Sequence, residues 1–254
     1  MILCVAFVVK NQISSQSISI FVDKSITWLM KRICLILLLF LPTILIAQQT
    51  EMMSSAHLKY LLYVPDLGAP ENGFPVLLFL HGAGERGDDL ELVKKHGPPS
   101  FLDDTTSFPF LVISPQCPDD SEWKPFLLLA LLNEIALIAN VDTNRIYVTG
   151  LSIGGDATWE LAMMAPNKIT AIAPICCEGD VSRACTLRDI PIWVFHGAQD
   201  DVVPSSYADK MVQALQDCDA YVKYTLYPDV DHFSWVPAYK NPELYKWFLQ
   251  QEKL

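Results

Sequence analysis

Apolar and polar positions alternate along the chain in blocks that predict strands and helices in turn. Several short runs are rich in β-branched and aromatic residues, which is typical of strands. The predicted strands cover residues 58–64, 76–80, 110–114, 145–149, 169–175, 192–195 and 221–227. Longer segments with apolar residues at helical spacing predict helices at residues 125–139, 154–164, 205–217 and 242–251.

Several predicted strands are almost entirely apolar, as a strand must be when helices cover both faces of its sheet. Because strands alternate with helices, we expect an α/β fold with a mostly parallel, doubly wound sheet and helices on both faces. Such sheets bind ligands in the loops at the carboxyl ends of their strands. These loops are expected to begin at His81, Ser114, Gly150 and His196, and after residue 227 in a loop that contains His232.

The first 47 residues do not follow this pattern. A basic pair directly after Met30 precedes a fourteen-residue apolar segment at 33–46, and Ala47 then precedes a polar stretch. This order predicts a secretory signal peptide cleaved after Ala47, since a membrane span needs about 20 apolar residues. An uncleaved anchor is the alternative. The position of the basic pair also predicts that Met30 is the true start and that 1–29 is an over-extended reading frame.

Residues 1–47 are therefore expected to be an N-terminal extension with a signal peptide, and residues 48–254 a single α/β domain that is secreted or periplasmic. The whole chain has 18 basic and 29 acidic residues and a net charge of −11. Removal of 1–47 takes away four basic residues and one acidic residue and leaves a net charge of −14. Such a charge disfavours nucleic acid and anionic membranes as partners, so neither is expected for the mature chain.

Cysteines remain after cleavage at Cys117, Cys176, Cys177, Cys185 and Cys218. An oxidising compartment permits disulfides, but an odd number of cysteines cannot all pair. Cys176 and Cys177 are adjacent and would bridge each other only with strain. We expect one of them to pair with Cys185 and leave the other pairings open. No Cys-x-x-Cys or Cys/His spacing predicts a zinc site.

A serine between two glycines lies where the predicted strand at 145–149 meets the predicted helix at 154–164. The segment is Gly150-Leu-Ser152-Ile-Gly154, the G-x-S-x-G pattern of a nucleophile elbow. The glycines leave room for a sharp turn that exposes the serine hydroxyl. The N–H groups of the following helix can stabilise developing negative charge. Ser152 is therefore the candidate nucleophile, and the alternative is a glycine-rich packing turn.

A nucleophilic serine needs a histidine as its base. The histidines of the chain are His57, His81, His96, His196 and His232. The first three precede the serine, and His81 and His196 each stand before a glycine at a strand end, which indicates a structural role. Only His232 lies in a late loop, where it would take the serine proton and return it to the leaving group. The alternative is a surface-loop histidine.

The carboxylate that orients the histidine is expected on the turn after the strand at 192–195. Asp200 lies on that turn and is the candidate. Asp201 is its competitor and would otherwise be a solvated loop residue or a helix-entry acid. Asp229 and Asp231 are too close in sequence to the histidine to be favoured.

An oxyanion hole would complete the site with two backbone N–H groups. One donor is expected from Ile153, the residue after the nucleophile, and the other from Ala83 in the glycine-rich loop after the strand at 76–80. A glycine-rich loop also suggests phosphate binding. The P-loop Gly-Lys-Ser/Thr is absent, and the spacing does not match a dinucleotide fingerprint, so that function is rejected.

These residues lie in segments that resemble the α/β-hydrolase superfamily. The matching segments are LLFLHGAGERGDD, ISPQCPDDSEW, VDTNRIYVTGLSIGGDATWELAMMAPNKITAIAPIC, IPIWVFHGAQDDVVP and YPDVDHFSW. More narrowly, the chain is similar to secreted carboxylesterases of the dienelactone-hydrolase, phospholipase/carboxylesterase and prolyl-oligopeptidase-like group. The resemblance implies an esterase fold with a triad of Ser152, Asp200 and His232, no metal and no cofactor. Its relatives include acetyl-xylan, feruloyl and short-chain carboxylesterases.

The chain departs from this pattern at Asp156, where relatives carry an aromatic or neutral residue. A carboxylate there would either disfavour an oxyanion or point away and act as a favourable first-turn acid. Trp123 and Trp235 flank the predicted site and are candidates for substrate binding, with ordinary packing as the alternative. The short segment between Trp123 and the next helix predicts an open, shallow pocket.

The leading hypothesis is a secreted serine carboxylesterase that acts on a small-molecule or polysaccharide-linked ester, including acetyl or feruloyl groups of cell-wall polysaccharides. A second hypothesis keeps the chemistry but cleaves peptides, as prolyl-oligopeptidase-like enzymes do. About 207 residues leave no room for the propeller that such peptidases usually carry. A third hypothesis is a catalytically inactive glycan-binding module, which the presence of all three triad residue types disfavours.

Overall fold

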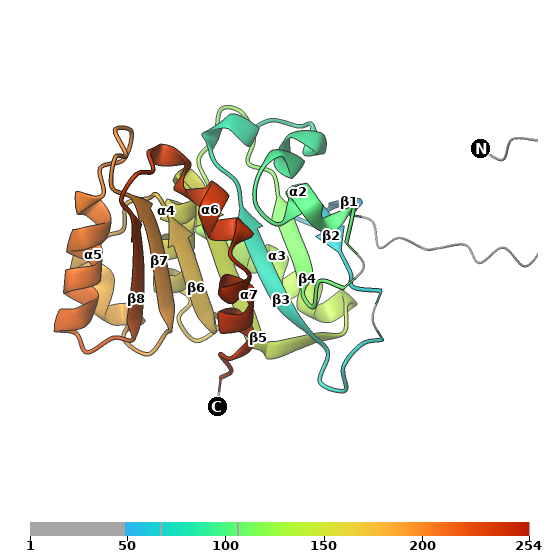
Figure 1. The fold of residues 1–254 in the computed structure, drawn as a ribbon. Coiled ribbons are helices and arrows are strands. Elements are labelled where there is room, and N and C mark those ends of the chain that lie inside the picture. The colour runs from blue at the N-terminus through green and yellow to red at the C-terminus, as the bar shows by residue number, and fades with distance from the viewer. Residues whose placement is uncertain (1–48, 67, 106, 254) are drawn as a thin grey trace, which may run out of the picture. The chain divides into compact units, whose positions relative to one another are not determined.

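One mixed sheet organises the residues that the computed structural model describes, 49–66, 68–105 and 107–253. Its strand order is β1-β2-β4-β3-β5-β6-β7-β8 (Figure 1). The strands are β1 Thr50–Met53, β2 Lys59–Tyr63, β3 Phe74–Leu80, β4 Leu111–Pro115, β5 Val141–Leu151, β6 Ala171–Ile175, β7 Ile192–Gly197 and β8 Val222–Tyr227. β1 and β2 run antiparallel at one edge, and all pairings from β4 to β8 are parallel.

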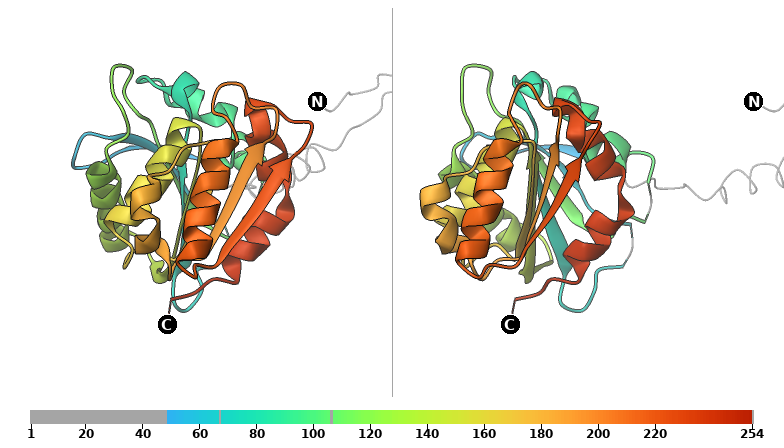
Figure 2. Two further views of the ribbon diagram at one scale, coloured as in Figure 1. Left: turned by 90° about the vertical axis from the view of Figure 1, so that its left-hand side faces the viewer. Right: turned by 60° about the vertical axis from the view of Figure 1, so that its left-hand side comes forward.

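Helices cover both faces of this sheet. The α-helices are α2 Pro99–Leu102, α3 Pro125–Ile138, α4 Ile153–Met164, α5 Ser206–Asp217, α6 Trp235–Lys240 and α7 Pro242–Leu249. Short 3-10 helices are η1 Ala83–Glu85, η2 Leu90–Lys95, η3 Val181–Leu187 and η4 His232–Ser234. In the turned views, α3, α4 and α5 lie on one face, and α6 and α7 lie on the other (Figure 2). The expected doubly wound α/β architecture is confirmed.

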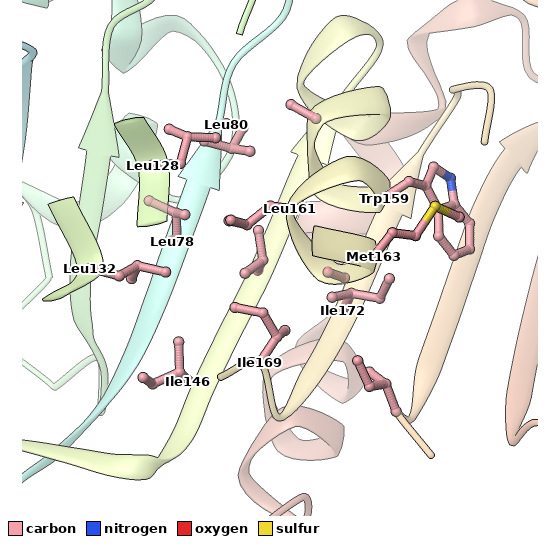
Figure 3. Packing of buried hydrophobic residues seen from close by; sticks show 14 of the residues in the cluster. Leu78, Leu80, Leu128, Leu132, Ile146, Trp159, Leu161, Met163, Ile169 and Ile172 are labelled. Atoms are coloured by element: carbon pink, nitrogen blue, oxygen red, sulfur yellow. The ribbon is translucent and has the colours of Figure 1, made fainter. Parts of the chain in front are cut away.

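Successive side chains of a strand point to opposite faces, so the central strands supply two hydrophobic cores. In β3, Leu78 and Leu80 pack into the core beneath α3, α4 and α5, whereas Leu77 and Phe79 pack into the core beneath α6 and α7. Figure 3 shows the first core, where the β3 leucines lie toward α3 side chains. All seven residues of β3 are buried, which explains the apolar run that predicts this strand.

The predicted elements all occur, with shifted ends. β5 begins four residues before the predicted start and continues to Leu151, so the strand leads directly into the serine turn. The sequence analysis missed β1, α2, α6 and the 3-10 helices. β1 is a largely exposed edge strand, which leaves little apolar pattern to detect. α2 and α6 are four and six residues long, too short for a periodic signal.

The predicted disulfide is wrong. Cys185 pairs with Cys218, which links η3 to the end of α5. Cys117, Cys176 and Cys177 are buried and free. Cys176 and Cys177 directly follow β6 and are buried in the interior, where neither thiol pairs with Cys185. Sequence spacing therefore did not predict which cysteines meet. The expected signal peptide lies outside the described residues. No helix in the described part of the chain is long and apolar enough to span a bilayer.

Candidate active site

The turn between β5 and α4 holds Ser152 in an unusual backbone conformation. Its φ is 53° and its ψ is −124°, which places a non-glycine residue in the left-handed half of backbone space. Such a conformation costs on the order of 1–3 kcal/mol and persists where surrounding structure enforces it. Here the Ser152 N–H donates to the Ile175 carbonyl oxygen (3.0 Å), and the Ser152 carbonyl accepts from the N–H groups of Gly155 (2.7 Å) and Asp156 (3.0 Å).

The glycines of the pattern are required by close backbone approach. A Cβ on Gly150 would collide with the carbonyl oxygen of Gly154, and a Cβ on Gly154 would collide with the carbonyl oxygen of Leu80. Both obstacles are backbone atoms that cannot rotate away. The glycines therefore let α4 start directly against the ends of β5 and β3, which presents the serine at the carboxyl edge of the sheet.

The structure brings the three predicted chemical groups into one hydrogen-bonded line. His232 Nε2 lies 3.2 Å from Ser152 Oγ, and His232 Nδ1 lies 2.8 Å from Asp200 Oδ2. Because a carboxylate only accepts, Nδ1 carries the ring proton and Nε2 accepts from the serine hydroxyl. The serine and histidine are 80 residues apart in sequence, and the histidine and aspartate are 32 apart. Asp201, the competing acid, is exposed.

The Asp200 side chain is fully buried, yet its oxygens are well supplied with donors. Oδ1 accepts from the backbone N–H groups of Val202 (3.0 Å) and Val203 (2.8 Å). Oδ2 lies near His232 and is also 3.2 Å from His196 Nε2. Several donors around one carboxylate offset the cost of burying its charge. The contact with His196 was missed in the sequence analysis, which gave that residue only a structural place at a strand end.

The two residues expected to supply the oxyanion donors each begin a helix near the serine. Ala83 opens η1 and lines the same cavity as Ser152, and Ile153 opens α4. Neither backbone N–H has a hydrogen-bond acceptor among the described residues. Both N–H groups are therefore left without a partner in the described part of the chain, as an oxyanion donor must be before substrate binds.

His81 anchors the loop that carries Ala83. Its Nδ1 donates to the Gly82 carbonyl oxygen (2.6 Å), and its Nε2 accepts from the Cys117 N–H (3.0 Å). Burial lowers the pKa of His81 to about 4, which keeps the ring neutral and allows one nitrogen to donate while the other accepts. A peptide bond points its C=O and N–H in opposite directions. Fixing the Gly82 carbonyl therefore also fixes the direction of the Ala83 N–H.

The serine opens into a cavity of about 310 Å³. Trp235 lines it, with its ring centroid 5.4 Å from that of His232. The other lining side chains include His96, Leu151, Val202 and Phe233, none of which the sequence analysis identified. Val202 and Phe233 are 65% and 55% exposed, so the outer rim is open and apolar. This fits the expected open pocket.

Trp123 does not lie in this cavity. It lines a separate hollow of about 160 Å³ beside α3, and its Nε1–H donates to the His81 carbonyl oxygen (3.2 Å). Its ring also packs against the His81 ring, with centroids 4.8 Å apart. The expectation that Trp123 contacts substrate is therefore not supported by its position. The alternative, a packing tryptophan, describes it better.

Asp156 points away from the serine. Its Oδ1 accepts from the backbone N–H of Glu178 (2.8 Å) in the loop after β6, which agrees with the second of the two expected orientations. Burial raises the pKa of Asp156 to about 6, and the nearby carboxylates of Glu178, Glu122 and Glu160 add to this effect. The carboxylate therefore braces a neighbouring loop.

Comparisons with known proteins agree with this fold. The model of the Dienelactone hydrolase family matches residues 123–240, which include the serine, the aspartate and the histidine. The crystal structure of a thermostable esterase superposes with a TM-score of 0.71 at 33% identity, over 82% of this chain and 64% of that one. The chain has the α/β-hydrolase fold.

The chain is also similar to two further proteins. It is 27% identical over 167 residues to the bifunctional acetylxylan esterase/xylanase XynS20E of Neocallimastix patriciarum. The matched region covers 61% of this chain and 23% of that protein. The chain shares the fold of Est1E from Butyrivibrio proteoclasticus, with a TM-score of 0.60 at 14% identity, over 80% of this chain and 98% of that one. The α/β-hydrolase chain thus spans only part of the xylan-acting relative.

Proposed function

We propose that this α/β-hydrolase is a secreted serine carboxylesterase. The observation that carries the proposal is the line of contacts from Ser152 Oγ to His232 Nε2 (3.2 Å) and from His232 Nδ1 to Asp200 Oδ2 (2.8 Å). These distances match the reach needed for proton transfer from a nucleophile to a base and for orientation of that base by an acid.

In the proposed reaction, Ser152 Oγ attacks the ester carbonyl carbon while its proton passes to His232 Nε2. Asp200 accepts a hydrogen bond from Nδ1–H and stabilises the imidazolium that forms. The N–H groups of Ala83 and Ile153 donate to the carbonyl oxygen as it becomes negative. His232 then gives its proton to the departing alcohol oxygen, which leaves Ser152 acylated.

Deacylation repeats the same steps with water. Water attacks the acyl carbon and transfers its proton to His232, and the histidine returns that proton to Ser152 Oγ as the carboxylic acid leaves. Every proton transfer passes through His232, which already contacts Ser152 in the resting protein. The neutral His81 keeps the Gly82 peptide plane in one orientation, so the Ala83 donor needs no reorganisation during catalysis.

The open rim supports an ester whose alcohol is large. Val202 and Phe233 are exposed beside the serine, and an exposed aromatic ring can stack on a sugar. The similarity to an acetylxylan esterase favours the same class of substrate. We therefore propose acetyl or feruloyl esters of cell-wall polysaccharides as the substrates. The signal-peptide pattern at 33–46 supports delivery to the exterior, where such polymers are found.

The test is hydrolysis of p-nitrophenyl acetate, butyrate and octanoate, methyl ferulate and acetylated xylan by the protein and its Ser152→Ala variant. We expect turnover that the alanine variant loses, together with labelling of Ser152 by a fluorophosphonate. Activity that persists in Ser152→Ala would refute the assignment of the nucleophile. A folded protein with no turnover and no labelling would instead favour a binding module. Turnover of peptide anilides without ester turnover would favour a peptidase.

A further inference from the structure

A second histidine contacts the candidate triad. His196 lies in β7, the strand before the turn that carries Asp200, and its side chain is fully buried. Its Nε2 is 2.8 Å from the Val203 carbonyl oxygen and 3.2 Å from Asp200 Oδ2. A carbonyl oxygen only accepts hydrogen bonds, so Nε2 must carry a proton. This N–H donates to the Val203 carbonyl, and the same nitrogen lies beside the carboxylate oxygen.

Asp200 Oδ2 is thus shared by two histidines. His232 Nδ1 approaches it at 2.8 Å from the loop after β8, and His196 Nε2 approaches it at 3.2 Å from β7. The other oxygen, Oδ1, is held by two backbone N–H groups of the turn itself. Of the two side chains that contact this carboxylate, His196 is the one that the proposed reaction does not use. Its Nδ1 has no hydrogen-bond partner among the described residues, so its only polar contacts are through Nε2.

We propose that His196 is a positioning residue that acts on catalysis through Asp200. Its Nε2–H donates to the Val203 carbonyl, the Val203 N–H donates to Asp200 Oδ1, and the ring nitrogen lies 3.2 Å from Oδ2, so the histidine fixes the plane of the carboxylate that His232 needs. The buried donor also supports the negative charge of Asp200, which keeps it able to stabilise the His232 imidazolium. The inference rests on the proposed esterase activity, because the effect is expressed in the rate of ester hydrolysis.

The first test compares His196→Gln with His196→Met, two side chains of similar length of which only the amide donates a hydrogen bond. His196→Met removes the hydrogen bond to the turn that carries Asp200 and the polar contact with its carboxylate; a contact of this kind is worth a factor of roughly 10 to 100 in an equilibrium constant, and we expect kcat to fall by about that factor with KM little changed. His196→Gln is expected to stay within about 3-fold of the wild type, because its amide N–H can reach the same oxygens. Equal kcat values for the Met variant and the wild type would overturn the proposal.

A double-mutant cycle with Asp200→Asn separates positioning from general structural damage. If His196 acts through the carboxylate, His196→Met lowers kcat much less once Asp200 is changed. An unchanged effect in that background would refute the inference. Thr225→Val is the matched control, because it removes the acceptor of the Trp193 Nε1–H (2.9 Å) between the same strands β7 and β8. It should lower stability without the loss of kcat.

Histidine ¹⁵N NMR gives a readout that needs no variant at His196. Asp200→Asn should shift the Nε2 signal of His196 as well as the Nδ1 signal of His232, whereas Asp201→Asn should shift neither. A His196 signal that is indifferent to Asp200→Asn would overturn the proposal even if the Met variant failed to fold. Failure of the esterase proposal itself would appear differently, as a wild-type protein without turnover or Ser152 labelling.

Discussion

The buried carboxylate of Asp156 makes a specific prediction about stability and pH. Its pKa rises from 3.8 to about 6 on folding, chiefly because burial disfavours the charged form. Between these values the folded protein binds more protons than the unfolded chain, so this residue makes stability fall as the pH rises from 4 to 6. The change Asp156→Asn removes the charge and keeps an oxygen that can accept from the Glu178 N–H. In the wild type, this N–H lies 2.8 Å from Asp156 Oδ1.

The size of the effect follows from the shift. One pKa unit corresponds to about 1.4 kcal/mol, so above pH 7 a shift of roughly two units lowers the free energy of unfolding by about 3 kcal/mol. The side chain keeps partial contact with solvent, so we expect Asp156→Asn to stabilise the protein by about 2–3 kcal/mol at pH 7.5. At pH 4 the difference should fall below about 1 kcal/mol, because the folded carboxyl is then protonated and the unfolded one is only partly ionised.

The assay is urea unfolding of both proteins at pH 4, 6 and 7.5, supported by thermal melts. For a domain of this size, the gain at pH 7.5 should raise Tm by roughly 5–10 °C. Asp189→Asn is the control, since that side chain is 91% exposed and should give no pH-dependent difference. A stability difference that does not change with pH, or a less stable Asp156→Asn protein at pH 7.5, would refute the reasoning.

Two further predictions concern the serine turn and its neighbouring loop. Ser152→Gly should raise the free energy of unfolding by about 1 kcal/mol while removing activity, since glycine adopts a φ of 53° without the cost borne by serine. Urea unfolding of Ser152→Gly beside Ser152→Ala tests this, and equal stability of the two variants would contradict it. His81→Phe keeps a ring against Trp123 but frees the Gly82 carbonyl, so kcat should fall by as much as ~10²-fold with little change in KM. Steady-state kinetics on p-nitrophenyl acetate test this, and an unchanged kcat would show that His81 does not direct the Ala83 N–H.

The local parts of the candidate site were predictable because they depend on neighbours in sequence. The glycines around Ser152 must be small whatever the rest of the chain does, since they face the backbone of the same turn and of β3. Asp200 and His232 were found because each follows a strand, and parallel strands bring their carboxyl ends to one edge. Their hydrogen bond, however, depends on how β7 and β8 pair and twist, which no local pattern states.

The residues that sequence reasoning missed share one property. None of them has a motif of its own: His96 and Phe233 line the cavity because distant segments fold together around it, and His196 meets Asp200, four residues later, in a direction that the sequence does not state. The same holds for the disulfide, in which Cys185 meets Cys218 across 33 residues because α5 packs against η3. The prediction that Trp123 binds substrate was not supported for a related reason. Its place in the sequence did not specify which cavity its ring would line.

The sequence by itself determined the α/β class, most of the strands and longer helices, and the serine turn, because hydrophobic period and turn chemistry act over a few residues. Only the tertiary structure decided which acid faces His232, that a second histidine shares that acid, where Asp156 points, and which side chains form the open rim. Those features depend on side-chain directions at the carboxyl edge of a twisted sheet. The packing of the whole domain sets these directions, and the order of residues along any one segment does not.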